Sequence, residues 1–138
     1  MIKTKAMNTK VLMIASSTYL GVSGLILTFL PEETASYHGI SNPLIQLVFQ
    51  IMGSMYLGFA MLNWMMKNNL IGGIYGRPLV LGNFVHFFVS TFALVKVVQP
   101  STEGEGLICF LMASIYLVFT LSFGYLIFNS PTSLSKTG

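Results

Sequence analysis

Four long apolar stretches divide the chain. They cover residues 11–30, 44–66, 78–98 and 107–128. At about 1.5 Å per residue, roughly 20 helical residues cross the ~30 Å hydrocarbon core of a bilayer. We therefore predict an all-α fold, an integral membrane four-helix bundle in which residues 1–138 form a single transmembrane domain. The first stretch follows a basic segment, as in a signal peptide, but it exceeds the 7 to 15 residues of a cleavable apolar region, so we expect a retained helix.

The connectors between these stretches contain residues that end helices. Pro31 and Pro43 bracket the first connector, Gly72, Gly73, Gly76 and Pro78 fill the second, and Pro100, Gly104 and Gly106 mark the third. Proline cannot donate a backbone hydrogen bond, and glycine permits tight turns. We expect loops at these positions and four helices in all.

The composition indicates a chain that lipid solvates. Apolar residues make up 54% and charged residues only 8% of the sequence, whereas about a quarter of an ordinary soluble domain is charged. Such a composition excludes disordered, collagen-like and disulfide-framework classes. Cys109 is the single cysteine, so neither an intrachain disulfide nor paired-thiol chemistry is available.

The charged residues divide between the two sides of the membrane. Six of the seven bases share one side, namely Lys3, Lys5, Lys10, Lys67, Arg77 and Lys136, whereas Glu32, Glu33, Glu103, Glu105 and the remaining base Lys96 share the other. By the positive-inside rule, we expect both termini to be cytoplasmic. Trp64 and Tyr75 fall where an inner interfacial aromatic belt is expected. The scattered bases form no nucleic-acid patch, so the lipid bilayer is the expected partner.

Small residues recur at helical spacing inside the apolar stretches. Ser17, Gly21, Gly24 and Thr28 form one stripe, and Ser54 with Gly58 and Thr120 with Gly124 form two further pairs. Helices in lipid associate through close packing of such residues. We interpret them as packing surfaces within the bundle, with a homo-oligomer contact as the alternative.

His86 is the most informative residue, because it is ionisable and lies about 12 Å into the third stretch. Equal-rise counting places Tyr19 and Tyr56 at its depth, and Tyr116 lies close to that depth in the fourth stretch. One hypothesis is a mid-membrane polar layer of these four residues that binds a small lipophilic molecule or lets His86 exchange a proton. The other is a neutral histidine hydrogen-bonded to a tyrosine hydroxyl in the bundle core.

Amide side chains define a further polar face. Gln46, Gln50, Gly53, Ala60 and Asn63 share one broad face of the second stretch. A buried amide in hydrocarbon needs partners, so this face should point at other helices. Asn63 and Asn83 lie at similar depth, and we expect them to bond to each other as structural glue. The alternatives are a ligand site that includes Asn63, Asn83 and Gln50, or an ion or proton pathway along this face.

Other chemistry has little support in the sequence. Haem with two histidine ligands is excluded because His38, the only other histidine, lies in the first connector. His38 with Glu32 and Glu33 could hold a divalent metal, although an ordinary polar loop is the simpler interpretation. Neither an HExxH motif nor a nucleophile–base pair at usable spacing is present. We expect no cofactor, no metal site and no catalytic residue.

The connector over residues 67–78 has the richest turn chemistry. Its glycines permit a tight turn, which is the simpler interpretation. In the alternative, its backbone amides meet a lipid headgroup while Lys67 and Arg77 attract the phosphate.

Three short motifs stand out within the four-helix plan. They are Leu30-Pro31-Glu32 at the end of the first helix, the glycine-rich turn before the third helix, and Gly82-Asn83-Phe84-Val85-His86 in the third helix. With this plan and these motifs, the chain resembles small bacterial membrane proteins of the broad DoxX-like type. The resemblance implies a multi-pass inner-membrane protein of a type in which some members are associated with redox or sulfur metabolism. It assigns no catalytic residues.

Three functions remain open at this point. The leading hypothesis is a non-enzymatic accessory or structural subunit that self-associates or binds another membrane protein. The second is a binding or carrier protein for a quinone or lipid around His86, and the third is a small ion or proton pathway.

Overall fold

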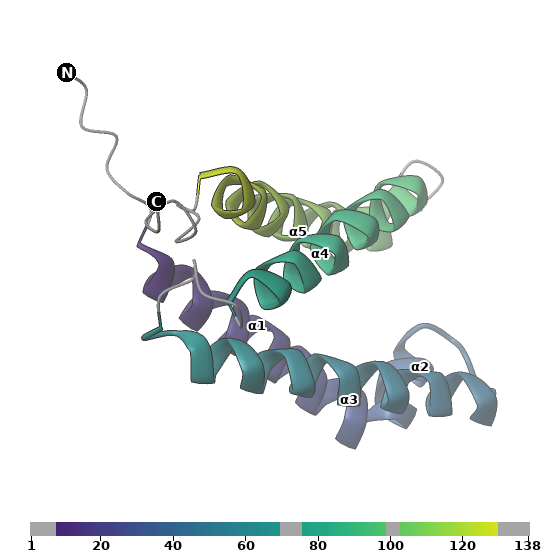
Figure 1. Cartoon of the computed structure of the whole chain (residues 1–138). Coiled ribbons are helices and arrows are strands. Elements are labelled where there is room, and N and C mark those ends of the chain that lie inside the picture. Colours follow the sequence, from purple (N-terminus) through teal and green to yellow (C-terminus); the bar gives the residue numbers. More distant parts are fainter. Residues whose placement is uncertain (1–7, 70–75, 99–102, 130–138) are drawn as a thin grey trace, which may run out of the picture. The chain divides into compact units, whose positions relative to one another are not determined.

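The computed structural model describes residues 8–69, 76–98 and 103–129, which form five helices and no strand. The helices are α1 (Thr9–Phe29), α2 (Pro31–Tyr37), α3 (Pro43–Met66), α4 (Gly76–Val98) and α5 (Glu103–Asn129) (Figure 1). The predicted all-helical class is therefore confirmed.

Four of the helices are long and apolar enough to cross a membrane, as the sequence predicts. The candidate spans are Thr9–Phe29, Pro43–Met66, Gly76–Val97 and Gly106–Asn129. The largest difference from the predicted boundaries is at α5, which begins at Glu103 instead of residue 107. The expectation of a loop at Gly104 and Gly106 was therefore wrong, since both glycines lie within this helix.

The expectation of a loop between the first two long helices was wrong, because this connector contains α2. Pro31 occupies the first turn, where its missing N–H costs nothing, and Glu32 and Glu33 complement the helix dipole. The helix ends before Gly39, which has a φ of 68°. The Gly39 N–H donates to the Ser36 carbonyl at 2.9 Å. A proline in this connector thus begins a short helix.

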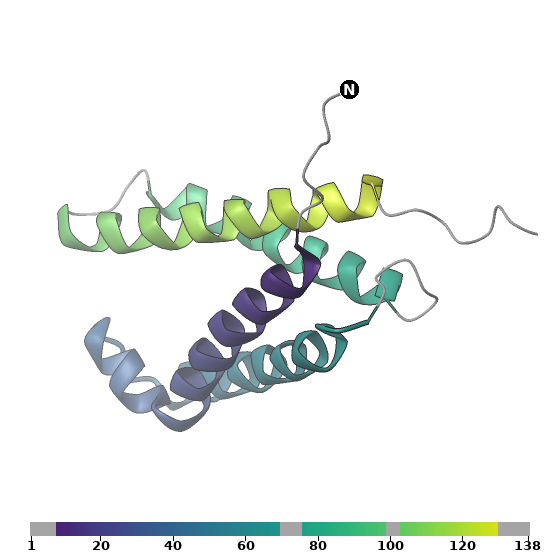
Figure 2. The same ribbon diagram turned by 90° about the vertical axis from the view of Figure 1, so that its left-hand side faces the viewer.

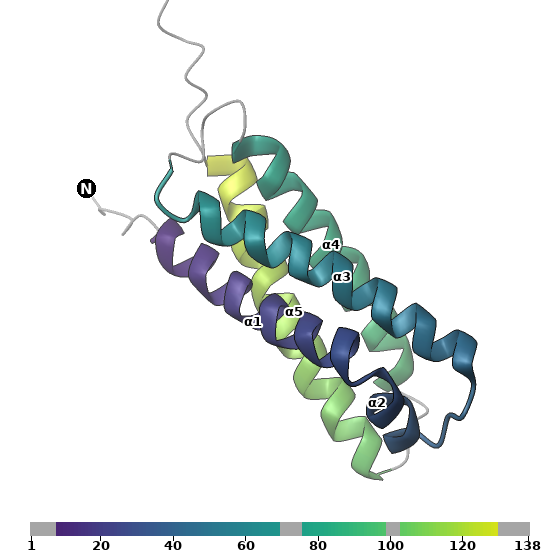
Figure 3. The same cartoon turned by 90° about the horizontal axis from the view of Figure 1, so that it is seen from below.

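The chain divides into two compact units, which we describe separately. The first covers residues 1–68 and the second residues 69–138. In the first unit, α1 and α3 pack side by side, and α2 contacts both (Figure 2). In the second unit, α4 packs against α5 (Figure 3).

The α1–α3 contact depends on two glycines. A Cβ atom on Gly24 would lie 2.9 Å from the Gly53 carbonyl oxygen, and one on Gly53 would lie 2.8 Å from the Gly24 carbonyl oxygen. Farther along, the Ser17 hydroxyl donates to the Ala60 carbonyl oxygen at 2.7 Å. The stripe on α1 thus packs against α3, and its interpretation as a packing surface is confirmed.

The two other small-residue pairs behave differently from each other. In the second unit, a Cβ on Gly124 would lie 3.2 Å from the Phe84 ring, so this glycine admits a close α4–α5 approach. On α3, Ser54 and Gly58 are exposed, and a Cβ on Gly58 would meet no described atom within 4 Å. The Ser54–Gly58 pair is thus unused in the α1–α3 contact.

Candidate functional site

His86 lies beside aromatic rings of its own helix and of α5. Its ring centroid is 5.9 Å from that of Tyr116 and 5.0 Å from that of Phe87. His86 is half-buried, whereas Tyr116 and Phe87 are buried. The second unit therefore brings together two residues of the hypothesised layer, His86 and Tyr116.

Around Phe87 the α4–α5 core is aromatic. The Phe87 ring stacks on Phe119 at 4.7 Å and on Phe123 at 5.8 Å between centroids, and it meets Tyr116 edge to face at 5.3 Å. We call Phe87, Tyr116, Phe119 and Phe123 the aromatic cluster. Offset stacked and edge-to-face pairs each add about 0.5–1.5 kcal/mol beyond the burial of their area. Sequence reasoning missed this cluster, although positions 116, 119 and 123 follow the i, i+3, i+7 spacing of one helix face.

A threonine pair also joins α4 and α5 beside the aromatic cluster. The hydroxyl oxygens of Thr91 and Thr120 are 3.3 Å apart, and both side chains are buried. Each hydroxyl also lies within hydrogen-bond distance of the carbonyl four residues earlier, Phe87 at 2.7 Å and Tyr116 at 2.8 Å. The two threonine hydroxyls have two hydrogens to donate, and the three contacts among which they are distributed all lie within the α4–α5 pair.

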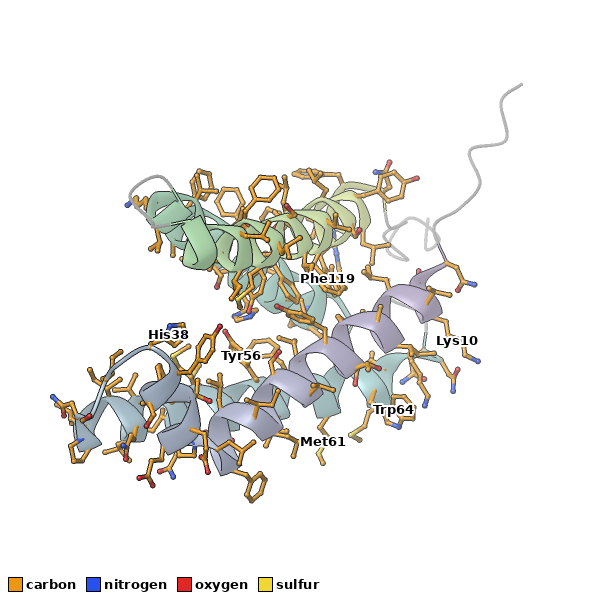
Figure 4. All side chains as sticks on the ribbon, turned by 180° about the vertical axis from the view of Figure 1, so that it is seen from behind. Lys10, His38, Tyr56, Met61, Trp64 and Phe119 are labelled. Carbon is orange, nitrogen blue, oxygen red and sulfur yellow. The ribbon has the colours of Figure 1, made fainter. Side chains whose placement is uncertain are left out.

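Tyr19 and Tyr56, the other two members of the hypothesised layer, belong to the first unit. Tyr19 lies on α1, and both tyrosine side chains are half-buried. Tyr56 lies on α3 and is labelled in Figure 4. Because His86 and Tyr116 belong to the second unit, the four-residue layer stays a prediction.

Asn63 joins α1 to α3 through a buried hydrogen-bond chain. Its Nδ2 atom donates to the Ser16 hydroxyl oxygen at 3.1 Å, and that hydroxyl donates to the Met13 carbonyl at 3.2 Å. Asn63 and Ser16 are fully buried. Ser16 was not singled out from the sequence, because it lies beside the small-residue stripe and not in it. The structural role expected of Asn63 is present, with Ser16 as a partner.

The remaining amides divide between burial and exposure. Asn83 is fully buried and donates from Nδ2 to the Leu79 carbonyl at 2.9 Å within α4. Asn63 and Asn83 lie in different units, so the bond predicted between them stays a prediction. On α3, Gln46 is half-buried and Gln50 is exposed. The predicted amide face is thus buried at Asn63 and not at Gln50.

The first connector does not assemble a metal site. Glu32, Glu33 and His38 are exposed, and the His38 ring meets Tyr37 edge to face at 5.2 Å. Among the described residues, no group of three or more His, Cys, Asp and Glu side chains is placed to hold a metal ion. The turn glycines Gly72 and Gly73 and the aromatic Tyr75 lie outside the described residues.

Comparisons with known proteins add no assignment. No protein-family model, curated protein or solved structure matches the chain. The resemblance to DoxX-like proteins, carried by residues 82–86 and the two connectors, accordingly stays a prediction.

Proposed function

We propose that this chain is a multi-pass protein of the inner (plasma) membrane, with both termini cytoplasmic, that acts as a non-enzymatic accessory or structural subunit. In this proposal its two helix pairs join into one four-helix bundle of the DoxX-like type. The main support for the proposal is that buried polar side chains form contacts between the helices of each pair.

Three polar contacts illustrate this use. The hydrogen bond from Ser17 to Ala60 and that from Asn63 to Ser16 join α1 to α3, and the Thr91–Thr120 contact joins α4 to α5. A transport pathway usually keeps intramembrane polar groups on a hydrated cavity. Here the same groups stabilise helix pairs, as expected of a rigid packing module.

A subunit also needs a surface for its partner, which is a second copy or another membrane protein. The Ser54–Gly58 pair on α3 supports such a contact, because it has small-xxx-small spacing and is exposed. Small residues at this spacing let two helix backbones approach closely.

Native mass spectrometry of the full chain from a mild detergent tests the subunit proposal. We expect a homo-oligomer or a co-purified membrane protein that Gly58→Leu disrupts. Ala15→Leu is the matched control, because it enlarges a small, exposed residue on α1. A wild-type chain that is only monomeric, or equal loss of the complex in both variants, contradicts the proposal.

The second candidate function is binding of a flat, lipophilic molecule such as a quinone. The specific observation is the His86 imidazole at the edge of the aromatic cluster, 5.9 Å from the Tyr116 ring between centroids. The flat ring of such a ligand can pack against aromatic side chains, and an imidazole can form a hydrogen bond with an oxygen of the ligand. The same mass spectra test this candidate. A ligand mass that is retained by the wild type and lost in His86→Leu supports ligand binding at this position. The absence of a ligand mass in the wild type counts against it.

A further inference from the structure

The charges of the first unit separate to its two ends. In residues 8–69 the lysines are Lys10 and Lys67, and the carboxylates are Glu32 and Glu33. Lys10 lies in the first turn of α1 and Lys67 caps the end of α3, whereas Glu32 and Glu33 lie in α2, beyond the other end of α1. Ser17 contacts Ala60 and Gly24 faces Gly53, so α1 and α3 run antiparallel. The two lysines therefore lie at the same end.

An aromatic ring completes this basic end. The Lys67 Nζ atom lies over the Trp64 ring, 3.0 Å from its centroid, in a cation–π contact. Trp64 is 51% exposed, and Figure 4 shows it at the same end of the first unit as Lys10. Tryptophan favours the level of the lipid headgroups, so the Lys67 ammonium is held at that level.

The site has positive charge without a carboxylate to balance it. The first turn of α1 contains no acidic residue, and no carboxylate of residues 8–69 lies at this end. The Lys67 ammonium has three N–H donors, of which the ring face engages one side, and Lys10 supplies a second ammonium. At the end of a membrane helix the abundant anion is the phosphate of a lipid headgroup.

We propose that Lys10, Trp64 and Lys67 form a headgroup site for an anionic phospholipid in the leaflet at this end. The two ammonium groups engage the phosphate, and the Trp64 ring packs beside the glycerol region. A zwitterionic choline lipid fits less well, because Lys67 already covers one face of the Trp64 ring and both lysines repel a choline ammonium. The site goes beyond the proposed function and does not depend on it.

The site contains its own probe. Trp64 is the only tryptophan of the chain, so the tryptophan emission, excited selectively over that of tyrosine, reports on this position alone. The full chain in a neutral detergent is titrated with phosphatidylglycerol and, separately, with phosphatidylcholine, and the midpoint of the emission change measures affinity. We expect phosphatidylglycerol to give a saturable change, weakened by added salt, and phosphatidylcholine to bind at least fivefold more weakly.

Matched substitutions separate the site from general charge attraction. Removing one lysine near a membrane surface costs about fivefold in affinity, and we expect this from Lys67→Gln and from Lys10→Gln. Lys96→Gln makes the same charge change on an exposed lysine in the last turn of α4 and should leave the midpoint unchanged. Circular dichroism confirms that each variant keeps its helices.

Three results would overturn the lipid site. The first is equal titration midpoints for phosphatidylglycerol and phosphatidylcholine. The second is equal weakening of phosphatidylglycerol binding by Lys67→Gln and Lys96→Gln. The third is the same emission change with inorganic phosphate at equal concentration. The last result would assign a general phosphate site instead of a lipid site.

Discussion

Gly24 of α1 and Gly53 of α3 face each other so closely that neither has room for a methyl group. A Cβ on Gly53 would meet the Thr28 hydroxyl and would lie 2.8 Å from both the Gly24 carbonyl oxygen and the Thr28 backbone nitrogen. Backbone atoms cannot rotate away as a flexible side chain can. The separation of α1 and α3 therefore depends on both glycines.

Gly53→Ala should destabilise the first unit. Over-packing of this kind costs about 1–3 kcal/mol, because α1 and α3 must move apart to admit the methyl group. The measurement is thermal or denaturant unfolding of the purified chain in detergent. Gly21→Ala is the matched control in the same helix pair, and it should be neutral or slightly stabilising, since its Cβ would lie 3.7 Å from the Ala60 Cβ, an ordinary contact distance. Equal losses from both variants would show that the close approach does not limit stability.

Asn63 and Ser16 should be energetically coupled. Hydrogen bonds between membrane helices contribute about 0.6 kcal/mol on average and up to about 1.7 kcal/mol. A double-mutant cycle of Asn63→Ala and Ser16→Ala, read from unfolding in detergent, should give a coupling in this range because the two side chains bond at 3.1 Å. As a control, the cycle of Asn63→Ala with the exposed Thr18→Ala should be additive. Additivity in both cycles would count against the hydrogen bond.

Phe87 should be the most sensitive position of the second unit. Phe87→Ala removes a fully buried ring that contacts Tyr116, Phe119 and Phe123, and the cavity left behind costs roughly 3 kcal/mol. The unfolding midpoint of the variant measures the loss. Phe92→Ala is the control, because this ring is 58% exposed on the same helix. If Phe92→Ala costs as much, the aromatic cluster is not the core of the helix pair.

The proposed orientation predicts that the C-terminus is cytoplasmic. A fluorescent protein fused after residue 138 should mature and fluoresce, and alkaline phosphatase at the same position should remain inactive, because phosphatase requires export. Phosphatase fused within the first connector should be active. The opposite pattern would mean that the basic connectors face outward, contrary to the positive-inside rule.

The sequence predicts the long helices well because their signal is strong and local. An apolar stretch of about 20 residues needs no knowledge of its neighbours to be recognised as a membrane helix. The short helix α2 was not predicted, because a proline such as Pro31 is equally compatible with the end of one helix and with the first turn of the next. Which reading applies depends on Glu32 and Glu33 after it and on Gly39, whose positive φ follows the helix end.

The candidate site was predictable only in part. His86 and Tyr116 were placed at neighbouring depths by counting residues, and their rings are neighbours in the second unit. Their aromatic surroundings were missed, because phenylalanine is common in every membrane helix and its spacing alone does not tell a core face from a lipid face. Ser16 was missed for a similar reason, since only the partner helix decides which of two adjacent serines receives the Asn63 amide.

The sequence by itself determined that this is an all-helical chain with four membrane-length helices, because hydrophobic length and charge are properties of each segment alone. Only the tertiary structure decided which small residues pack against a neighbouring helix. Gly24 and Gly53 face each other across α1 and α3, Gly124 lies against the Phe84 ring, and a Cβ on Gly58 would meet no described atom within 4 Å. Lipid is as apolar as the helices, so hydrophobicity cannot select a packing face, and the shapes of the facing surfaces make that selection.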